Sequence, residues 1–245
     1  LTGTQLGNYG RDLGWTEQGP RRLLEALLER TSVPRIRLSS LQAQDIRQGL
    51  LDLWRDKRLC PHFHLPLQSG SDRVLAAMRR RYTAAQFLDA VAAIRAAVPA
   101  VAITTDVIAG FPGETEAEFE ATLDLCREAG FAAMHCFPYS RRPQTGAVKM
   151  AGHLPPDARR QRLERLLDIA RQSSEDFREA HQGTSAEVLW EHESDGLWQG
   201  LTGNYIRAYT AANEDLTNRL LPTRLQGLEA EGMRGTLTLT ETASV

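Results

Sequence analysis

The sequence predicts an α/β protein with a parallel sheet, followed by a small all-β domain. A buried, β-branched run from Val101 to Ile108 ends in a glycine turn, Gly110 to Gly113, and leads into a helix. Strand-like and helix-like segments alternate before and after it, which implies parallel strands with right-handed crossovers, open or closed into a barrel. The last 60 or so residues change to short strands separated by Gly and Asn turns.

The alternation sets the expected elements and the domain boundary. Thr83 with Gln86 and Thr115 with Glu118 have the spacing of capping boxes, so a helix is expected after each. In the first domain we expect a strand end over 1–9, helices over 20–30, 44–54, 83–97 and from 115, and strands over 35–40, 62–68, 101–108 and 132–139. A long helix follows from residue 155, and Gly183 ends it. In the second domain we expect strands over 185–192, 196–202, 204–211, 219–227 and 235–241. These elements give a domain over residues 1–182, with its boundary near Gln182, and a β-domain over 183–245.

The composition excludes several classes of protein. The 245 residues are 42% hydrophobic and 24% charged, the balance of a soluble globular protein, and the net charge of −2 carries no whole-protein signal for nucleic acid. No apolar run is long enough for a membrane span, and no signal peptide is present. Cys60, Cys126 and Cys136 are odd in number and far apart, which argues against a disulfide framework and for a reducing cytoplasm.

The predicted strands place polar side chains on one face of the sheet. Their alternation puts these residues together: Arg35, Arg37, Ser39, His62, His64, Gln68, Thr104 and Asp106. Such a wide polar face suggests a partial barrel that encloses a polar ligand. Asp106 is a carboxylate within an apolar strand, so it faces a ligand or a polar network, for example with Arg35 or Arg37.

A metal site is a second hypothesis for the same face. His62 and His64 form an H-x-H pair on one strand, a spacing that can chelate a metal ion. With His135 and Asp106 they suggest a metal-dependent hydrolase with a barrel site. A third hypothesis is a non-catalytic RNA-binding module, considered below.

Five motifs in order carry a resemblance to a known family. They are LTGTQLGNYG (1–10), RIRLSS (35–40), HLPLQSGSDRVLAAMRRRYT (64–83), DVIAGFPGETEAEFE (106–120) and FPYSRRPQTGAVKM (137–150). The chain resembles the radical S-adenosylmethionine methylthiotransferases, from the middle of their catalytic domain to the C-terminus. The first two motifs are most similar to the branch that acts on threonylcarbamoyladenosine in tRNA. The second domain resembles a TRAM domain, with GLTGNY (200–205) as its marker.

The resemblance implies a fold and a chemistry. The fold is a partial parallel (β/α) barrel of the radical SAM type without its N-terminal strand and cluster loop, since the chain begins at Leu1 as if near a strand end. The whole protein would use S-adenosyl-L-methionine and two four-iron–four-sulfur (4Fe-4S) clusters to methylthiolate a tRNA nucleoside beside the anticodon. The three cysteines lack the C-x-x-x-C-x-x-C spacing, so cluster ligands are expected upstream of Leu1, with no cluster held and no activity in these 245 residues alone.

The resemblance also assigns candidate residues. For S-adenosylmethionine they are Gln5, Ser39, Gln68, Ser69, Asp106, Gly110, Gly113 and Tyr139. Gln5 corresponds to the end of a strand beside the methionine part of the cofactor, and Gly110 to Gly113 to the turn beside its adenine. None of these is expected to transfer protons; their part is positioning and the exclusion of water.

Local basic clusters are candidates for contact with a tRNA anticodon stem-loop. They lie at Arg79–Arg81, Arg141–Arg142 and Arg159–Arg165, and the second domain mixes aromatic and basic side chains suited to stacking on bases. The residues singled out are Arg80, Arg142, Tyr205 and Arg207. Trp198 and Tyr209 belong to the same mixture, although aromatic residues in so small a domain often form its core.

Overall fold

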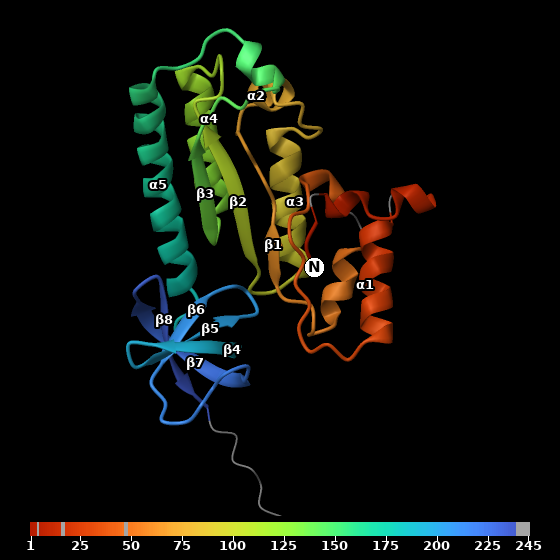
Figure 1. Ribbon diagram of the computed structural model, residues 1–245, viewed down its shortest axis with the longest axis vertical. Helices are drawn as coiled ribbons and strands as arrows, with labels where there is room; N and C mark the ends of the chain where they lie inside the picture. The colour runs from red at the N-terminus through yellow and green to blue at the C-terminus, as the bar shows by residue number, and fades with distance from the viewer. Residues whose placement is uncertain (4, 16–17, 47–48, 239–245) are drawn as a thin grey trace, which may run out of the picture. The chain divides into compact units, whose positions relative to one another are not determined.

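The computed structural model describes residues 1–3, 5–15, 18–46 and 49–238 (Figure 1). The chain forms two compact units, Leu1–Ser174 and Glu175–Val245. The sequence had placed the boundary near Gln182. The structure places it earlier because Phe177, at the end of the long helix, packs against the core of the second unit. None of the described helices is long and apolar enough to cross a membrane.

The first unit contains a parallel sheet in the order β1-β2-β3. The strands are β1 (His62–His64), β2 (Ala102–Ala109) and β3 (Ala133–Pro138). The helices are α1 (Gly19–Arg30), α2 (Asp72–Ala77), α3 (Ala84–Ala97), α4 (Glu116–Ala129) and α5 (Pro156–Glu179). Short 3-10 helices cover Leu6–Asn8, Arg11–Leu13, Ala43–Asp45, Leu51–Arg55 and Gly146–Lys149.

The sheet continues beyond β1 as extended chain without regular pairing. Residues 35–40, expected as a strand, make only two isolated bridges, Ile36 with Leu59 and Ser40 with His64. Leu1 lies alongside them, since its N–H donates to Arg37 O and its carbonyl accepts from Ser39 N. The described part of the expected barrel is therefore a three-stranded sheet that is extended beyond β1 by two loosely paired segments, residues 35–40 and then Leu1.

The expected strand over 62–68 is shorter than predicted. Pro66 has no N–H to offer a neighbouring strand, and the next amide, of Leu67, donates to the Thr105 hydroxyl at 2.9 Å in place of a backbone carbonyl. Pairing resumes at Gln68, which bridges to Val107. β1 consequently ends at His64.

Both capping boxes are confirmed. The Thr83 hydroxyl accepts from Gln86 N at 3.2 Å, and the Gln86 side chain accepts from Thr83 N at 3.0 Å, at the start of α3. Thr115 and Glu118 make the same reciprocal pair at the start of α4. Two amide groups that a helix end would leave unsatisfied are thus bonded in each case.

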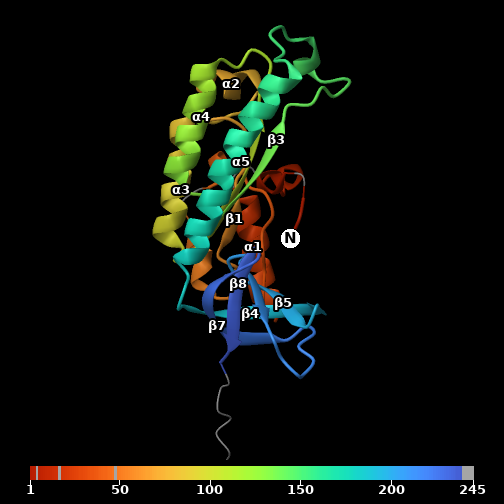
Figure 2. The same ribbon diagram turned by 90° about the vertical axis from the view of Figure 1, so that its left-hand side faces the viewer.

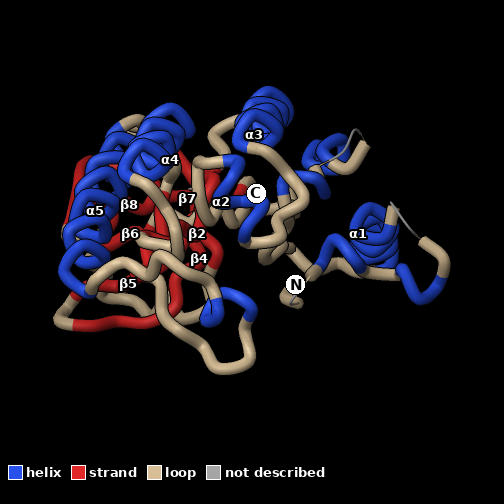
Figure 3. Tube along the Cα trace, turned by 90° about the horizontal axis from the view of Figure 1, so that it is seen from above, coloured by secondary structure: helices blue, strands red, loops and turns tan. Residues whose placement is uncertain are grey.

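Helices α3, α4 and α5 cover one face of the sheet (Figures 2 and 3). Phe87 and Ile94 of α3 and Phe119 of α4 are fully buried there, with Phe63 of β1 and Val107 of β2. These strand residues have the parity opposite to the polar face, so the helices bury the apolar face of the sheet as the alternation predicts.

The helix expected over 44–54 is wrong as a continuous element. The structure has 3-10 turns at Ala43–Asp45 and Leu51–Arg55, with residues 47–48 outside the described part. Helix α2, which the sequence reading missed, begins after Ser71, whose hydroxyl accepts from Val74 N at 3.4 Å. Helix α2 ends at Ala77, and the arginine run that begins at Arg79 follows shortly after it. Arg79 and Arg80 of this run line the pocket described below.

The second unit is a closed five-stranded barrel in the order β4-β5-β6-β8-β7. Its strands are β4 (Ser185–Ser194), β5 (Leu197–Thr202), β6 (Arg207–Thr210), β7 (Leu220–Glu229) and β8 (Gly232–Leu237). Residues 239–241 of the last expected strand lie outside the described residues. Trp190 and Trp198 are buried in the core of this barrel. Trp198 therefore packs inside the barrel and is not exposed for stacking on an RNA base.

Candidate functional site

The register of the sheet brings the predicted polar side chains together. His64 lies opposite Thr104 on the next strand, and Asp106 lies opposite His135 on the strand after that. Because paired residues of parallel strands share a face, these four side chains line one side of the sheet. The predicted polar face is confirmed for β1 and β2, and β3 adds His135 to it.

Asp106 is paired with two histidines. Its carboxylate oxygens lie 3.3 Å from His64 Nε2 and 3.2 Å from His135 Nδ1. Burial alone would raise the pKa of Asp106, but the hydrogen bonds and charges of His64 and His135 outweigh it and hold the pKa below its usual value. Asp106 is therefore an ionised carboxylate at neutral pH.

The H-x-H pair does not act as a chelating pair. His62 Nε2 lies 3.2 Å and His64 Nδ1 2.9 Å from the Thr104 hydroxyl, so both rings are held through one threonine. Burial, with the nearby charge of Arg37, lowers the pKa of His62 to about 3. His62 is thus a neutral, buried residue, and only His64 of the pair reaches Asp106.

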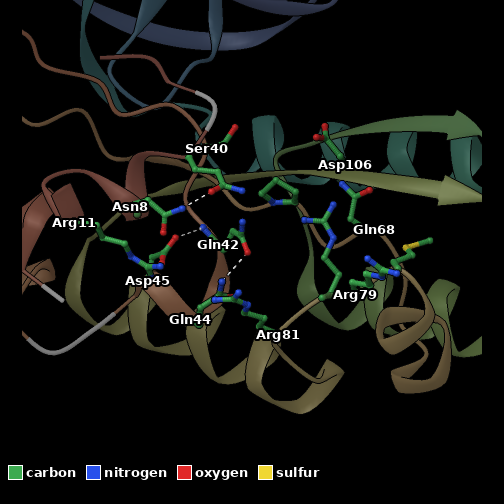
Figure 4. A pocket seen from close by; sticks show the side chains of 15 residues that line it. Asn8, Arg11, Ser40, Gln42, Gln44, Asp45, Gln68, Arg79, Arg81 and Asp106 are labelled. Atoms are coloured by element: carbon green, nitrogen blue, oxygen red, sulfur yellow. Dashed lines mark hydrogen bonds between the residues drawn. The ribbon is translucent and has the colours of Figure 1, made fainter. Parts of the chain in front are cut away.

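A polar pocket of about 710 Å³ opens where the strands of the first unit end (Figure 4). Three separate stretches of chain bring the predicted residues Gln5, Gln68 and Asp106 to its wall. Arg80, predicted for RNA contact, lines the same pocket. Figure 4 shows Asn8 and Arg11 on one side and Gln68 and Asp106 on the other.

Gln68 is held in an unusual backbone conformation. Its φ of 68° lies in the left-handed region, which costs a non-glycine residue about 1–3 kcal/mol. The backbone is fixed by two hydrogen bonds, from Gln68 N to Asp106 O at 2.8 Å and from Ile108 N to Gln68 O at 3.0 Å. Such strain is concentrated at functional sites, where it aims a side chain in a required direction.

The glycine turn after β2 is built around two residues with positive φ, Gly110 at 77° and Gly113 at 75°. Gly110 N donates to the Glu114 carboxylate at 2.9 Å, and Glu114 is in turn buried against Arg162 at 2.7 Å. A Cβ on Gly110 would lie 2.6 Å from the Arg159 side chain. The turn is therefore rigid and admits no larger residue at Gly110 without movement of its neighbours.

Two hydroxyl groups near the carboxyl ends of the strands are buried without a hydrogen-bond partner among the described residues. They belong to Ser39 and Tyr139. Tyr139 packs edge-to-face on Phe111 with ring centroids 5.6 Å apart, and its backbone N–H donates to Ala109 O at 2.8 Å. An unsatisfied buried hydroxyl is suited to accept or donate a hydrogen bond to a ligand.

Ser69 is placed differently from its prediction. It is fully buried, with its hydroxyl 3.3 Å from the Thr122 hydroxyl of α4 and accepting from Ser71 N at 3.2 Å. These contacts hold the strand end against α4 and do not reach the pocket wall. Ser40 and Arg79 do line the pocket. Ser40 was missed, and its signal was a serine at a strand end; Arg79 was named within a basic cluster for tRNA and not for this pocket.

The basic residues fall into two groups. Arg162 and Arg165, from the cluster at Arg159–Arg165, are used internally, because they pair with Glu114, Glu116 and Glu120. Arg142 is exposed in the loop after β3, and Arg207 is exposed on β6 with its guanidinium 3.3 Å from the Gln199 side chain. Tyr205, 52% exposed with a φ of 69°, precedes β6.

The cysteines do not form a ligand set. Cys126 belongs to the hydrophobic core on the helix side of the sheet, and the half-buried Cys136 packs against that core because it has the parity of Met134. Burial raises the pKa of both thiols, that of Cys136 to about 11. Cys60 is also buried. Protonated, buried thiols do not fit an iron–sulfur cluster, whose ligands are thiolates.

The sequence signature of the radical SAM superfamily matches residues 17–126. The threonylcarbamoyladenosine tRNA methylthiotransferase MtaB of Bacillus subtilis is 34% identical over 232 residues, covering 92% of this chain and 51% of that protein. MtaB of Thermotoga maritima is 36% identical over 238 residues, covering 95% of this chain and 53% of that protein. Residues 17–126 of this chain thus carry the signature of the radical SAM superfamily.

Further relatives and a solved structure agree with this family. The tRNA-2-methylthio-N(6)-dimethylallyladenosine synthase of Geotalea uraniireducens is 36% identical over 240 residues, covering 96% of this chain and 54% of that protein. Coproporphyrinogen III oxidase (HemN) from Escherichia coli, a radical SAM enzyme, covers 86% of this chain and 51% of its own length with a TM-score of 0.53 at 15% identity, a likeness of fold alone. The chain spans about half the length of the curated relatives that it matches. The resemblance inferred from the five motifs is confirmed.

Proposed function

We propose that this chain takes part in the radical S-adenosylmethionine-dependent methylthiolation of a tRNA nucleoside, N6-threonylcarbamoyladenosine beside the anticodon. The observation that carries the proposal is its similarity to tRNA methylthiotransferases along 92–96% of its length. Relatives named for threonylcarbamoyladenosine and for dimethylallyladenosine have similar identities, so the choice of nucleoside rests on LTGTQLGNYG and RIRLSSL. The expected compartment is the cytoplasm.

The described residues fit S-adenosylmethionine. This molecule carries a positive sulfonium and ammonium group and a negative carboxylate, and the pocket offers ionised Asp106 for the cations and Arg79 and Arg80 for the carboxylate. Gln5 and Gln68 add amide groups to the wall. When bound, S-adenosylmethionine would supply the sulfonium carbon–sulfur bond whose reductive cleavage starts the radical chemistry.

The remaining candidates would serve the same ligand in other ways. The hydroxyls of Ser39 and Tyr139 have unused hydrogen-bonding capacity. Gly113, where an added Cβ would meet nothing closer than 3.9 Å, would let a flat base approach the backbone of the turn, whereas the Arg159 side chain fills the space beside Gly110. Ser69 would act as a positioning residue, because it fixes the strand end that bears Gln68. The part of these side chains is to bind, orient and exclude water.

The two four-iron–four-sulfur clusters of the proposed whole reaction find no ligands here. Cys60 and Cys126 are buried and Cys136 is half-buried, and the pKa values of Cys126 and Cys136 are raised, so no step through a cluster is assigned to these 245 residues. We propose that the chain alone holds no cluster and is inactive.

For the tRNA we propose contacts from both units. Arg80 and Arg142 in the first unit offer charges for phosphate, and Arg207 and exposed Tyr205 in the barrel offer charge and a stacking ring. A closed five-stranded β-barrel that carries GLTGNY at 200–205 supports its assignment as a TRAM domain for the anticodon stem-loop.

The test is nucleoside analysis of tRNA from the source organism after deletion of the gene that encodes this chain. Mass spectrometry should show loss of the 2-methylthio form of N6-threonylcarbamoyladenosine and accumulation of the unmodified precursor. Re-expression of the gene is the control and should restore the modification. Loss of a 2-methylthio isopentenyl nucleoside in its place would overturn the branch, and unchanged 2-methylthio nucleosides would overturn the function.

A further inference from the structure

Three side chains from three neighbouring strands converge on the polar face of the sheet. They are His64 of β1, Asp106 of β2 and His135 of β3, and each offers a ligand atom within 4.8 Å of the other two. The strands hold them in register, because Asp106 lies directly opposite His135 and His64 lies opposite Thr104, two residues before Asp106. Ligand atoms placed by paired strands are fixed in position before any ion arrives.

The separations match those of a metal site. Bonds of about 2.1 Å from one ion to nitrogen and oxygen place two ligand atoms roughly 3.4 Å apart in a tetrahedral arrangement. Asp106 Oδ2 lies 3.3 Å from His64 Nε2, and Asp106 Oδ1 lies 3.2 Å from His135 Nδ1. The two histidines contact different oxygens of the carboxylate, and the ligand atoms of the three residues lie within 4.8 Å of one another, so rotation of the side chains would bring them around one ion.

The contacts around His64 resemble those that orient a metal-binding histidine. The second ring nitrogen of His64, Nδ1, lies 2.9 Å from the Thr104 hydroxyl. This contact leaves Nε2 facing Asp106 and fixes the orientation of the ring. Thr104 is itself held by His62 Nε2 at 3.2 Å, and both Thr104 and His62 are buried. A histidine that binds a metal usually has its other nitrogen bonded in this way.

The donor set and exposure indicate the kind of ion. Two imidazoles and one carboxylate suit first-row transition ions such as Zn²⁺, whereas Ca²⁺ and Mg²⁺ prefer oxygen ligands alone. The side chain of His64 is 15% exposed, that of Asp106 27% and that of His135 61%. The site is therefore reached from solvent through His135, and coordination positions stay open beside three protein ligands.

We propose that His64, Asp106 and His135 form a binding site for a divalent transition-metal ion of the Zn²⁺ class. The proposal goes beyond the methylthiolation proposed above and does not rest on it. Both proposals use the Asp106 carboxylate, so the metal ion and a cationic group of S-adenosylmethionine would compete for it.

The test is titration of the metal-free 245-residue chain with Co²⁺ and Zn²⁺. Co²⁺ should bind with a stoichiometry of one, give the intense visible absorption of a four-coordinate site, and be displaced by Zn²⁺.

The variants separate this site from adventitious binding. His135→Ala removes an exposed ligand without disturbing the core and should abolish stoichiometric binding, as should Asp106→Asn. Thr104→Val keeps the shape of the side chain and should weaken binding about 10- to 100-fold, through loss of the contact that orients His64. His192→Ala, an exposed histidine of the barrel, and Cys136→Ser should bind like the original chain. Absence of stoichiometric binding, or binding that survives His135→Ala, would overturn the proposal.

Discussion

His62 and Asp106 show how two residues on one sheet face can have opposite electrostatic requirements. Asp106 is stabilised as an anion by His64 and His135. His62 lies two residues before His64 on the same strand and is 7% exposed. Burial and the positive charge of Arg37 disfavour its protonated form, so it stays uncharged in the folded chain. The consequence is that His62 makes the folded chain less stable as the pH falls below 6.5.

His62→Gln should flatten that dependence. Below pH 6.5 the unfolded chain binds a proton at His62 that the folded chain does not accept until about pH 3, so unfolding takes up a proton and stability falls as the pH drops through this window. Between pH 6.5 and 4.5 the loss amounts to roughly 2 kcal/mol. Denaturant unfolding at both pH values should show this loss in the original chain and a smaller one in His62→Gln, with exposed His192→Gln as the control. An unchanged pH dependence in His62→Gln would show that the buried ring is already charged.

At the scale of elements, the turn between β2 and α4 is held in place by several local interactions. The strand ends at Ala109, the backbone turns through Gly110 and Gly113 with positive φ, and the Thr115–Glu118 capping box starts the helix. Glu114 joins the turn to Arg162 of α5 through a buried ion pair of 2.7 Å. The loop is therefore fixed on both sides, as a surface that positions a ligand requires.

Gly110→Ala should destabilise this turn by more than its backbone strain alone. An L-residue at a φ of 77° costs roughly 1–2 kcal/mol, and the added Cβ would lie 2.6 Å from the Arg159 side chain. Gly14→Ala is the matched control, because Gly14 has a φ of 78° and open space around the added atom. Chemical denaturation should therefore show a larger loss for Gly110→Ala. Equal losses would mean that Arg159 moves aside without cost.

Sequence patterns within a few residues predicted the turn between β2 and α4 correctly. The errors in strand length and strand pairing came from interactions between distant segments. The capping boxes and the glycine turn act within a few residues, so they are readable in the sequence. Residues 35–40 have the alternation of a strand, but whether they pair depends on distant segments, and only Ile36 and Ser40 form bridges. Pro66 was visible, yet its effect on pairing depended on the position of Thr105 in the next strand.

The candidate site was predictable to a similar degree. Strand parity identified His64, Gln68 and Asp106, because alternation is a property of any strand. It could not identify Arg79 or Ser40, whose positions depend on how α2 and an irregular segment fold back to the strand ends. The hydrogen bonds of Ser69 to α4 were equally invisible in the sequence.

At the scale of the whole molecule, the chain supplies a pocket and a barrel, and the proposal that it holds no cluster can be tested directly. We expect that these 245 residues, reconstituted anaerobically with iron and sulfide, take up no stoichiometric four-iron–four-sulfur cluster. The reason is that Cys126 and Cys136 lie in the core on the helix side of the sheet with raised thiol pKa values, away from the polar face. Iron analysis and visible absorption provide the readout, and Cys126→Ser with Cys136→Ser is the control for adventitious iron. One cluster per chain, lost in these variants, would show that the core opens to form a site.

The central claim is that Gln5, Gln68 and Asp106, brought together from three stretches of chain, form a pocket for S-adenosylmethionine. Equilibrium dialysis of S-adenosylmethionine against the 245-residue chain tests it most directly. The chain should bind one molecule, and Gln68→Ala should weaken binding roughly two- to tenfold, the effect of one lost hydrogen bond. Gln161→Ala, an exposed amide on α5, should leave the affinity unchanged. Absence of binding, or equal affinity in Gln68→Ala and Gln161→Ala, would contradict the account.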